Sequence, residues 1–463
     1  MPRISAGTAT VALGAAVAAV AAAATVALGP LALALPVAGG IAYLLVRYPL
    51  VLYIAFLYIG LFKGRGAIES MPIDVTLVLG ALLAGVCLLR LLEGRFRLPP
   101  LMLGLPYLLI ATLLAISLIW TPELAYGTEK TLKFASLTAL ATFAPFFLVD
   151  GRAELRQLLV LLAGVGVVGA LIVLSLGSTS SEEGGRLVFN EAADTIFTAR
   201  FLLTGAFVLL FGAALKLWHR HRLPIAVVGV VVVVIAASIG SRGPLAGFVF
   251  AVLCTIVAIV LREPRRVLPV LLAIGIGVAV LPFVSLPETS SERIGGLVSN
   301  PTGAFSEDLR SRLYDKGFEL AKENPVRGIG AGGFFIYSYV VTNREERYPH
   351  NIFLEMSAEL GLAPTLLLAA SILMMLAFLY KRAWAARGED RTLIYLLSGV
   401  FLVNFFATQF SGDFNDNKTF WAMLGLGWLV AAYGLRSGEE PAGDEAPPAK
   451  RELPAKRELA VRQ

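Results

Sequence analysis

The chain has 463 residues, of which 57% are apolar and only 16% are charged, whereas soluble domains average about 45–50% apolar and about 25% charged residues. The mean hydropathy is +0.76, and so few polar side chains cannot cover the surface of a soluble globule. The composition therefore excludes a soluble enzyme, a disordered protein and a disulfide scaffold. The net charge of +6 is spread over many short loops, which excludes a nucleic-acid binder and is typical of membrane topology signals.

Apolar segments long enough, or nearly long enough, to cross a hydrocarbon core of about 30 Å recur along the whole chain. None shows the alternation of a membrane barrel, so we predict an all-α polytopic integral membrane protein. The first segment resembles a signal peptide, but its cleavage would spoil the charge pattern of the loops. The second and third are short enough for a tilted hairpin or a re-entrant pair, so we expect 12 to 14 crossings. The fourteen segments cover approximately 8–28, 31–46, 50–62, 73–92, 101–119, 131–149, 156–177, 196–215, 223–239, 244–261, 267–284, 361–380, 392–411 and 418–435.

Basic residues are concentrated in every second connection between these segments. Positively charged short loops stay in the cytoplasm, so both termini should be cytoplasmic and the long loop at 285–349 should be periplasmic. This predicts an N-terminal bundle of about eleven spans over 1–284, a periplasmic loop over 285–360, a three-span bundle over 361–435 and a disordered cytoplasmic tail over 436–463. The basic connections carry Arg47; Arg95 and Arg97; Arg152 and Arg156; Lys216, Arg220 and Arg222; Arg262, Arg265 and Arg266; and Lys381, Arg382, Arg387 and Arg391.

Metal ligands are scarce in this sequence. The two cysteines, Cys87 and Cys254, lie inside apolar segments, so they form neither a disulfide framework nor part of a four-ligand zinc site. The turn GDFNDN offers the carboxylates of Asp413 and Asp416 as cation ligands, although a solvated turn explains them better. We therefore predict no metal and no cofactor.

The periplasmic loop contains a helical pattern from Asp308 to Lys322, in the sequence DLRSRLYDKGFELAK. Its apolar residues fall on one stripe, so we expect an amphipathic helix that lies against the outer membrane–water boundary. Arg312, on the polar face, either pairs with Asp308 at i−4 spacing or grips a lipid diphosphate with its two-pronged guanidinium. The stripe consists of Leu309, Leu313, Gly317 and Leu320.

The run ENPVRGIGAGGF follows this helix and carries four glycines over 328–333. Glycines at such spacing can cradle phosphates, but no strand precedes them, as a dinucleotide site requires. We instead expect a tight turn that lets the backbone approach a substrate or another helix.

The next segment, YPHNIFLEMSAELGLAP, contains the one histidine that we place outside the membrane. Pro349 suits the first position of a helix, which would put His350 in the first helical turn. A helix N-terminus disfavours imidazolium, so His350 should be neutral and able to accept a proton. The alternative is a histidine that only satisfies the helix end. His219 and His221 lie in a cytoplasmic KLWHRHR run that is explained as a positive anchor.

Arginines from distant parts of the chain should meet His350 on the outer side. Arg242 lies in the tight turn SIGSRGPL between two spans, where it either snorkels to headgroups or lines a cavity. Cations there suit an anionic, membrane-embedded substrate, and a neutral histidine suits proton abstraction from a hydroxyl. Transfer from a lipid diphosphate to an alcohol needs these parts and no metal, because arginines can neutralise the leaving group. Further candidate substrate contacts are Arg186, Asn190, Arg200, Arg327 and Asn351.

These motifs together resemble a known family over roughly 180–412. SRG at 241–243, R-x-x-x-x-(G/A)-F beginning at Arg312, ENPVRGIGAGGF, and HN-x9-G at 350–361 are similar to the O-antigen polymerase and O-antigen ligase family of bacterial envelopes. GRLVFNEAAD near 185–194 is similar to a loop of that family. The resemblance implies an inverting, metal-independent glycosyltransferase of the inner membrane, with His350 as base and Arg242 and Arg312 as diphosphate ligands.

The same resemblance implies the partners of the reaction. The donor would be an undecaprenyl-diphosphate-linked oligosaccharide, the acceptor a lipid-linked repeat or lipid A core, and a chain-length regulator would be a further candidate partner beside membrane lipid. The ligase pattern G-x-x-(G/T/Y) reads GLAP here, with Pro364, and fourteen spans exceed the dozen of ligases, so we favour a polymerase. The alternative from another class is a lipid-linked glycan transporter. Transporters place ionisable residues near mid-membrane and show repeated halves, and the sequence shows few of the former and no repeat.

Overall fold

The computed structural model describes residues 34–62, 74–180, 186–188, 195–218, 220–262, 309–342, 348–410 and 413–435. Over these ranges the chain is helical, apart from a short antiparallel pair formed by β1 (Ser178–Ser180) and β2 (Arg186–Val188). The prediction of an all-α membrane protein is confirmed. The predicted spans 8–28 and 267–284 and the tail from residue 436 lie outside the described residues, so the total of fourteen spans stays a prediction.

The helices follow one another along the chain with short connections. In order they are α2 (Ala34–Arg47), α3 (Pro49–Tyr58), the 3-10 turn η2 (Ile59–Phe62), α5 (Val75–Leu92), α6 (Leu101–Ser117), α7 (Leu124–Lys133), the π-helical turn η3 (Phe134–Thr138), α8 (Ala139–Phe143), α9 (Pro145–Leu148), α10 (Arg152–Leu176), α11 (Thr195–Ala214), α12 (Arg222–Ser238), α13 (Arg242–Val260), α17 (Leu309–Glu323), α18 (Phe334–Thr342), α19 (Ile352–Leu360), α20 (Leu362–Ala385), α21 (Gly388–Ala407) and α22 (Lys418–Tyr433).

Seven helical stretches in the described part of the chain are long and apolar enough to cross a membrane. The helices α12 and α13 begin and end within two residues of the predicted spans 223–239 and 244–261. The continuous helix from α7 to α9 begins at Leu124, seven residues before the predicted span, because a charged segment continues the apolar one. The seven are Val75–Leu92, Leu124–Leu148, Arg152–Ser175, Thr195–Ala214, Arg242–Val260, Leu362–Ala385 and Gly388–Ala407, and three shorter apolar helices cover Pro49–Phe62, Leu101–Ser117 and Arg222–Ser238.

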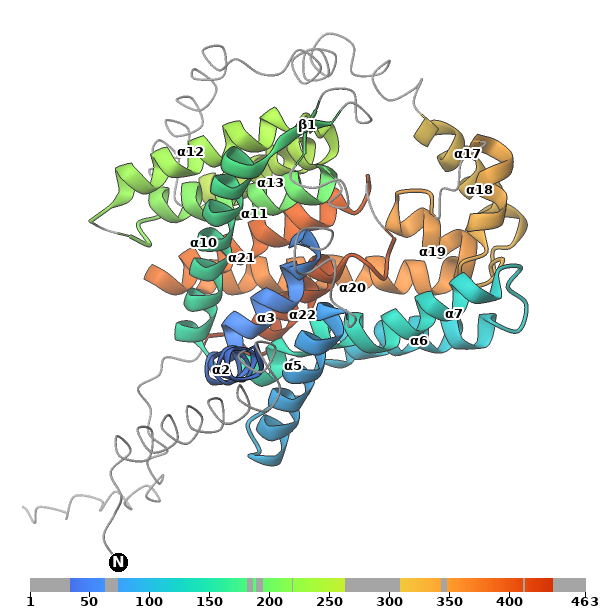
Figure 1. Cartoon of the computed structure of the whole chain (residues 1–463), viewed down its shortest axis with the longest axis horizontal. Coiled ribbons are helices and arrows are strands. Elements are labelled where there is room, and N and C mark those ends of the chain that lie inside the picture. The colour runs from blue at the N-terminus through green and yellow to red at the C-terminus, as the bar shows by residue number, and fades with distance from the viewer. Residues whose placement is uncertain are drawn as a thin grey trace, which may run out of the picture.

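The centre of the bundle is α11, whose side chains are buried without interruption from Thr198 to Ala213. It packs against α10, α12, α13 and α21 (Figure 1). Gly166 of α10 and Gly205 of α11 let two backbones meet, since a Cβ on Gly166 would lie 2.8 Å from the Cα of Gly205. Small residues at such crossings are how membrane helices gain close packing without a hydrophobic driving force.

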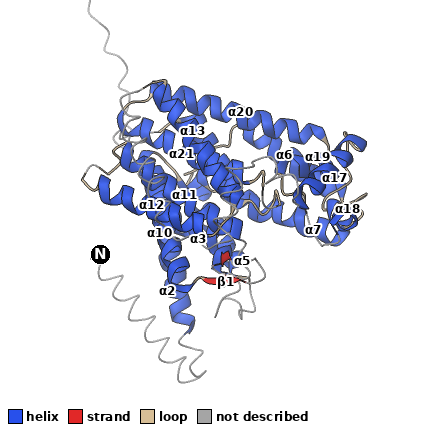
Figure 2. Ribbon diagram, turned by 90° about the horizontal axis from the view of Figure 1, so that it is seen from above, coloured by secondary structure: helices blue, strands red, loops and turns tan. Residues whose placement is uncertain are grey.

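The predicted basic connections come together at one end of the bundle. Arg152 donates to Asp390 (3.0 Å) and so joins the starts of α10 and α21. Arg95 donates to Asp150 (3.1 Å), and Arg262 lies over an aromatic ring of α20. The other end carries α17, α18 and α19 together with the start of α7, as Figure 2 shows beside the first turns of α20. We call this second region the α17–α19 end.

Candidate functional site

Three segments from distant parts of the chain meet at the turn 408–410, which follows α21. The backbone N–H of Ile352 donates to the carbonyl of the first residue of the turn (3.1 Å). The hydroxyl of Tyr314, on α17, donates to the carbonyl of the middle residue (2.8 Å). A Cβ added to Gly243 would lie 2.8 Å from the Cβ of the last residue, Phe410. The starts of α13 and α19 and the first half of α17 therefore surround one turn.

The three residues predicted to carry the chemistry belong to these segments. Arg242 is the first residue of α13 and is half-buried, Arg312 lies two residues before Tyr314 and is exposed, and His350 lies two residues before the start of α19 and is half-buried. The fold thus brings Arg242, Arg312 and His350 to the surroundings of the turn 408–410. Their roles remain predictions.

His350 lies just outside α19 rather than in its first turn. The helix begins at Ile352, and Asn351 caps it by accepting hydrogen bonds from the N–H groups of the second and third helical residues (3.1 and 3.0 Å). The predicted helix start at Pro349 is therefore wrong, because an Asn side chain is a much better N-cap than the preceding residues. His350 itself has a φ of 59°, a left-handed conformation that is uncommon for a residue with a side chain. Its ring meets the ring of Tyr348 edge-on at 4.8 Å.

The helix α17 is amphipathic, but its apolar stripe faces the protein. Leu313 and Leu320 are buried, and a Cβ added to Gly317 would lie 2.7 Å from Leu354 of α19. The expectation that this stripe rests on the membrane boundary is therefore wrong, since α19 covers it. Periodicity marks the buried face of a helix without identifying what covers that face. Asp308, the alternative partner of Arg312, lies outside the described residues.

A cavity of 380 Å³ adjoins the turn 408–410. Asn351 and Gln409 line it on the side of the site, and Phe318, Leu354 and Leu362 line it with apolar surface from α17, α19 and α20. A mostly apolar hollow with a few polar groups at one edge is the usual form of a small-molecule site.

The remaining candidate substrate contacts differ in position. Arg200 is buried, with 4% of its surface exposed; it donates to Asn417, and its guanidinium lies over the ring of Phe197. Arg327 is exposed in the turn after α17. Arg186 belongs to β2, whose side chains are not described, and Asn190 lies outside the described residues. The burial of Arg200 favours support of the turn 413–417 from within.

The glycine-rich turn after α17 allows a close approach between backbones, as predicted. Gly330 has a φ of 99°, and a Cβ added to it would lie 2.6 Å from the Cα of Thr121. Its N–H donates to the carbonyl of Glu359 (3.0 Å), and the Thr121 hydroxyl donates to the carbonyl of Ala331 (2.7 Å). The glycines therefore fasten the turn to α19 and to the start of α7, and these contacts are with protein rather than with phosphate.

A Gly330→Ala substitution should destabilise the protein by about 2–5 kcal/mol, because left-handed strain costs about 1–2 kcal/mol and an overpacking clash about 1–3 kcal/mol. The matched control is Gly388→Ala, since Gly388 also has a positive φ, of 55°, but a Cβ there meets nothing within 4 Å. Thermal unfolding in detergent would compare the two variants. Equal shifts of the midpoint would contradict the role of the close backbone approach.

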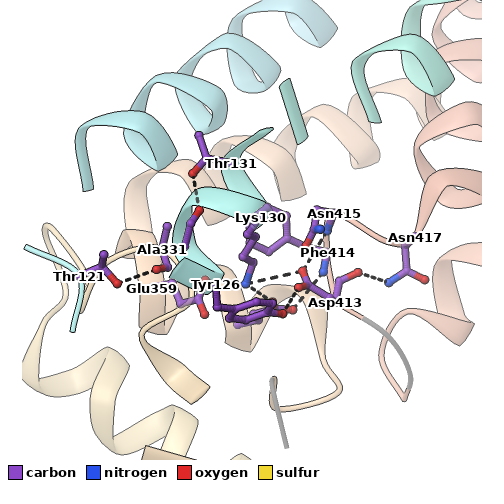
Figure 3. A network of polar contacts seen from close by, with 12 residues as sticks. Thr121, Tyr126, Lys130, Thr131, Ala331, Glu359, Asp413, Phe414, Asn415 and Asn417 are labelled. Atoms are coloured by element: carbon purple, nitrogen blue, oxygen red, sulfur yellow. Dashed lines mark hydrogen bonds and ion pairs between the residues drawn. The ribbon is translucent and has the colours of Figure 1, made fainter. Parts of the chain in front are cut away.

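A buried charged cluster lies beneath the start of α19, and the sequence analysis missed it. Lys130 of α7 donates to Glu355 and to Glu359 (2.6 Å), and its Nζ lies 3.6 Å from Asp413. Tyr126 donates to the other carboxylate oxygen of Asp413, and Figure 3 shows these groups turned toward one another. The four ionised side chains are at most 1% exposed. We call Lys130, Glu355, Glu359 and Asp413 the Lys130 cluster.

This cluster corrects the expectation of a solvated turn at 412–417. Asp413 is buried because Lys130 and Tyr126 satisfy both of its oxygens, whereas Asp416 stays exposed. One signal in the sequence pointed to the cluster: Glu355 and Glu359 are four residues apart, on one face of the helix that follows His350. A lysine at the edge of an apolar span was the second.

The helical spans, the end of the bundle where Arg242, Arg312 and His350 gather, and the adjoining cavity define a polytopic membrane protein with a cationic site where its helices end. Residues 227–369 match the family model described as O-antigen ligase. The matched stretch contains Arg242, Arg312 and His350, and it confirms the resemblance to the O-antigen polymerase and ligase family, a family of membrane enzymes that process O-antigen and other surface glycans. No curated protein matches the chain.

Proposed function

We propose that the protein is a membrane glycosyltransferase that moves a glycan from undecaprenyl diphosphate to an acceptor hydroxyl on the periplasmic side of the bacterial inner membrane. The observation that carries this proposal is the meeting of the α13 start, α17 and the His350 segment at the turn 408–410, beside a cavity of 380 Å³. Two guanidinium groups and an imidazole at the end of a membrane bundle suit a lipid diphosphate headgroup.

The proposed reaction is a single displacement. The acceptor oxygen attacks the anomeric carbon, the bond from that carbon to the diphosphate oxygen breaks, and His350 takes the hydroxyl proton. Arg242 and Arg312 hold the diphosphate and offset the charge that develops on the leaving oxygen. Attack from the face opposite the leaving group inverts the anomeric centre.

The orientation of the site follows from the basic connections. They gather at the end of the bundle that is opposite the α17–α19 end. Because short positive loops remain cytoplasmic, this arrangement supports a periplasmic α17–α19 end and cytoplasmic termini.

The acceptor decides between a polymerase and a ligase, and we favour the polymerase. Purified protein would be given the lipid-linked repeat unit alone, and then together with lipid A core. Growth of a lipid-linked chain from the repeat unit alone is the result expected of a polymerase. Transfer that starts only after lipid A core is added would assign the ligase reaction instead.

Metal chelation should leave the rate of transfer unchanged. In the proposed reaction arginines neutralise the diphosphate, and both oxygens of Asp413 are already engaged by Lys130 and Tyr126. Initial rates would be measured before and after dialysis against EDTA, and again after Mg²⁺ or Mn²⁺ is restored. A rate that falls on chelation and recovers with either ion would contradict the proposed chemistry.

The Lys130 cluster is the one observation that favours transport as a second function, because ionisable residues inside membrane proteins often mark substrate or proton paths. The cluster is closed to solvent, however, with every member at most 1% exposed. Proteoliposomes would separate the two functions. Movement of the lipid-linked glycan across the bilayer without a new glycosidic bond would replace the transferase proposal.

A further inference from the structure

We propose that Lys130 is a positioning residue for the transfer reaction: through the Lys130 cluster it holds the start of α19, and with it His350, in place, and it does so only while the cluster retains carboxyl protons. This inference rests on the proposed function of His350. None of the residues of the cluster is proposed to touch the substrate.

The cluster joins three parts of the chain that lie far apart in the sequence. Lys130 belongs to α7, Glu355 and Glu359 to α19, and Asp413 to the turn that precedes α22. The ammonium group of Lys130 reaches the carboxylates of both helical residues and of Asp413. A single cation therefore connects α19 to two neighbouring elements.

Glu355 makes a further contact that fixes the direction of α19. Its Oε2 accepts a hydrogen bond from the backbone N–H of Phe414 (3.1 Å), while its Oε1 accepts from Lys130. Glu355 lies one helical turn after the N-cap Asn351 and hence close to His350 along the chain. A shift of Glu355 would be passed to His350 by the rigid first turn of the helix.

The charges of the cluster do not balance if every group is ionised. One ammonium faces three carboxyl groups, and an unpaired charge without solvent is very unfavourable. The balance is reached when two of the three carboxyl groups keep their protons. Burial is the main reason that the pKa values of Glu355 and Glu359 are raised, and the charge of Asp413 adds to it.

The other groups that face the cluster are either uncharged or open to solvent. Tyr126 contributes a neutral hydroxyl from α7. Lys133 lies 2.7 Å from Glu129 and 3.8 Å from Asp416, and all three are at least 36% exposed, so water screens their charges. Arg200 reaches the same turn through Asn417, on the side away from Lys130.

The sign of the pH dependence follows from this balance. A carboxyl group whose pKa is raised in the folded state contributes stability below its unfolded pKa and loses that contribution as the pH rises through the raised pKa. Alkaline pH should therefore loosen α19 and lower the rate of transfer.

Two substitutions should move this alkaline limit in opposite directions. In Lys130→Met all three carboxyl groups must hold protons, so the docked cluster binds one proton more and the limit should move to lower pH. In Glu359→Gln the cluster binds one proton fewer, so the limit should move to higher pH. Gln suits this position because only Oε2 of Glu359 accepts from Lys130. A difference of one proton changes the docking equilibrium about tenfold per pH unit.

The experiment uses the full-length protein in proteoliposomes. The rate of transfer and the hydrogen exchange of the α19 amides would be measured against pH for the wild type and both variants, with thermal unfolding followed in parallel. Lys133→Met is the matched control, since it removes an exposed lysine from the same helix and should leave the limit unmoved. If Lys130→Met does not fold, the upward shift in Glu359→Gln decides the matter.

A cluster that serves only for packing would lower the rate by the same factor at every pH in both variants, and that result would overturn the proposal. So would an equal shift in the Lys133→Met control. A wild-type protein with no transferase activity would refute the proposed function alone, because the exchange of α19 against pH would still report on the cluster.

Discussion

A His350→Ala variant is expected to lose transfer by about 10²–10⁴-fold, the usual cost of removing a general base, while it still binds the lipid-linked donor. The donor is held by its diphosphate and its lipid chain, and neither needs the imidazole. The base is needed only when the acceptor hydroxyl gives up its proton. The loss should therefore appear in kcat rather than in donor affinity.

Initial rates with the lipid-linked repeat, together with donor binding measured on the same preparation, would test this expectation. His221→Ala is the matched control, because His221 lies just before α12 and is exposed. Near wild-type turnover in His350→Ala would refute the mechanism. Loss of donor binding in that variant would instead assign His350 to the diphosphate.

The positions of the helices were largely predictable, because apolar runs end at charged or turn-forming residues. Both α12 and α13 begin at an arginine, and the predicted boundaries differ by no more than two residues. The start of α19 was placed too early because Pro349 outweighed Asn351, whose side chain caps the helix. The face of α17 was predicted correctly and its neighbour was not, since periodicity contains no information on what covers an apolar stripe.

The Lys130 cluster could not be derived from local patterns. Lys130 and Glu355 are 225 residues apart, and nothing in the neighbourhood of either names the other. A lysine at the end of a span ordinarily indicates snorkelling to headgroups. Only the packing of α7 against α19, made possible by glycines such as Gly330, turns that lysine inward. The meeting of Arg242, Arg312 and His350 was easier to infer, because loop charge alone assigned them to one side.

Replacing Arg242 or Arg312 by Lys is expected to weaken transfer by about tenfold to 100-fold. Lysine keeps the charge but loses the planar, two-pronged grip on a diphosphate, and a lost hydrogen bond between charged groups costs about 1.5–3 kcal/mol. At Arg242 the structure adds a reason. It is the first residue of α13, where the helix dipole favours anions over cations, so an arginine there does not serve the helix. The same dipole would attract a bound diphosphate.

The two lysine variants should lose donor affinity as well as rate, in contrast to His350→Ala. Binding of a lipid-linked diphosphate and the rate of transfer would both be measured, with Arg310→Lys as the control on α17. Arg242 is half-buried beside the turn 408–410, whereas Arg312 is exposed. We therefore expect the larger loss at Arg242, because desolvation strengthens its grip on an anion. Unchanged donor binding in both variants would remove the arginines from the diphosphate site and leave His350 as the only residue with an assigned role.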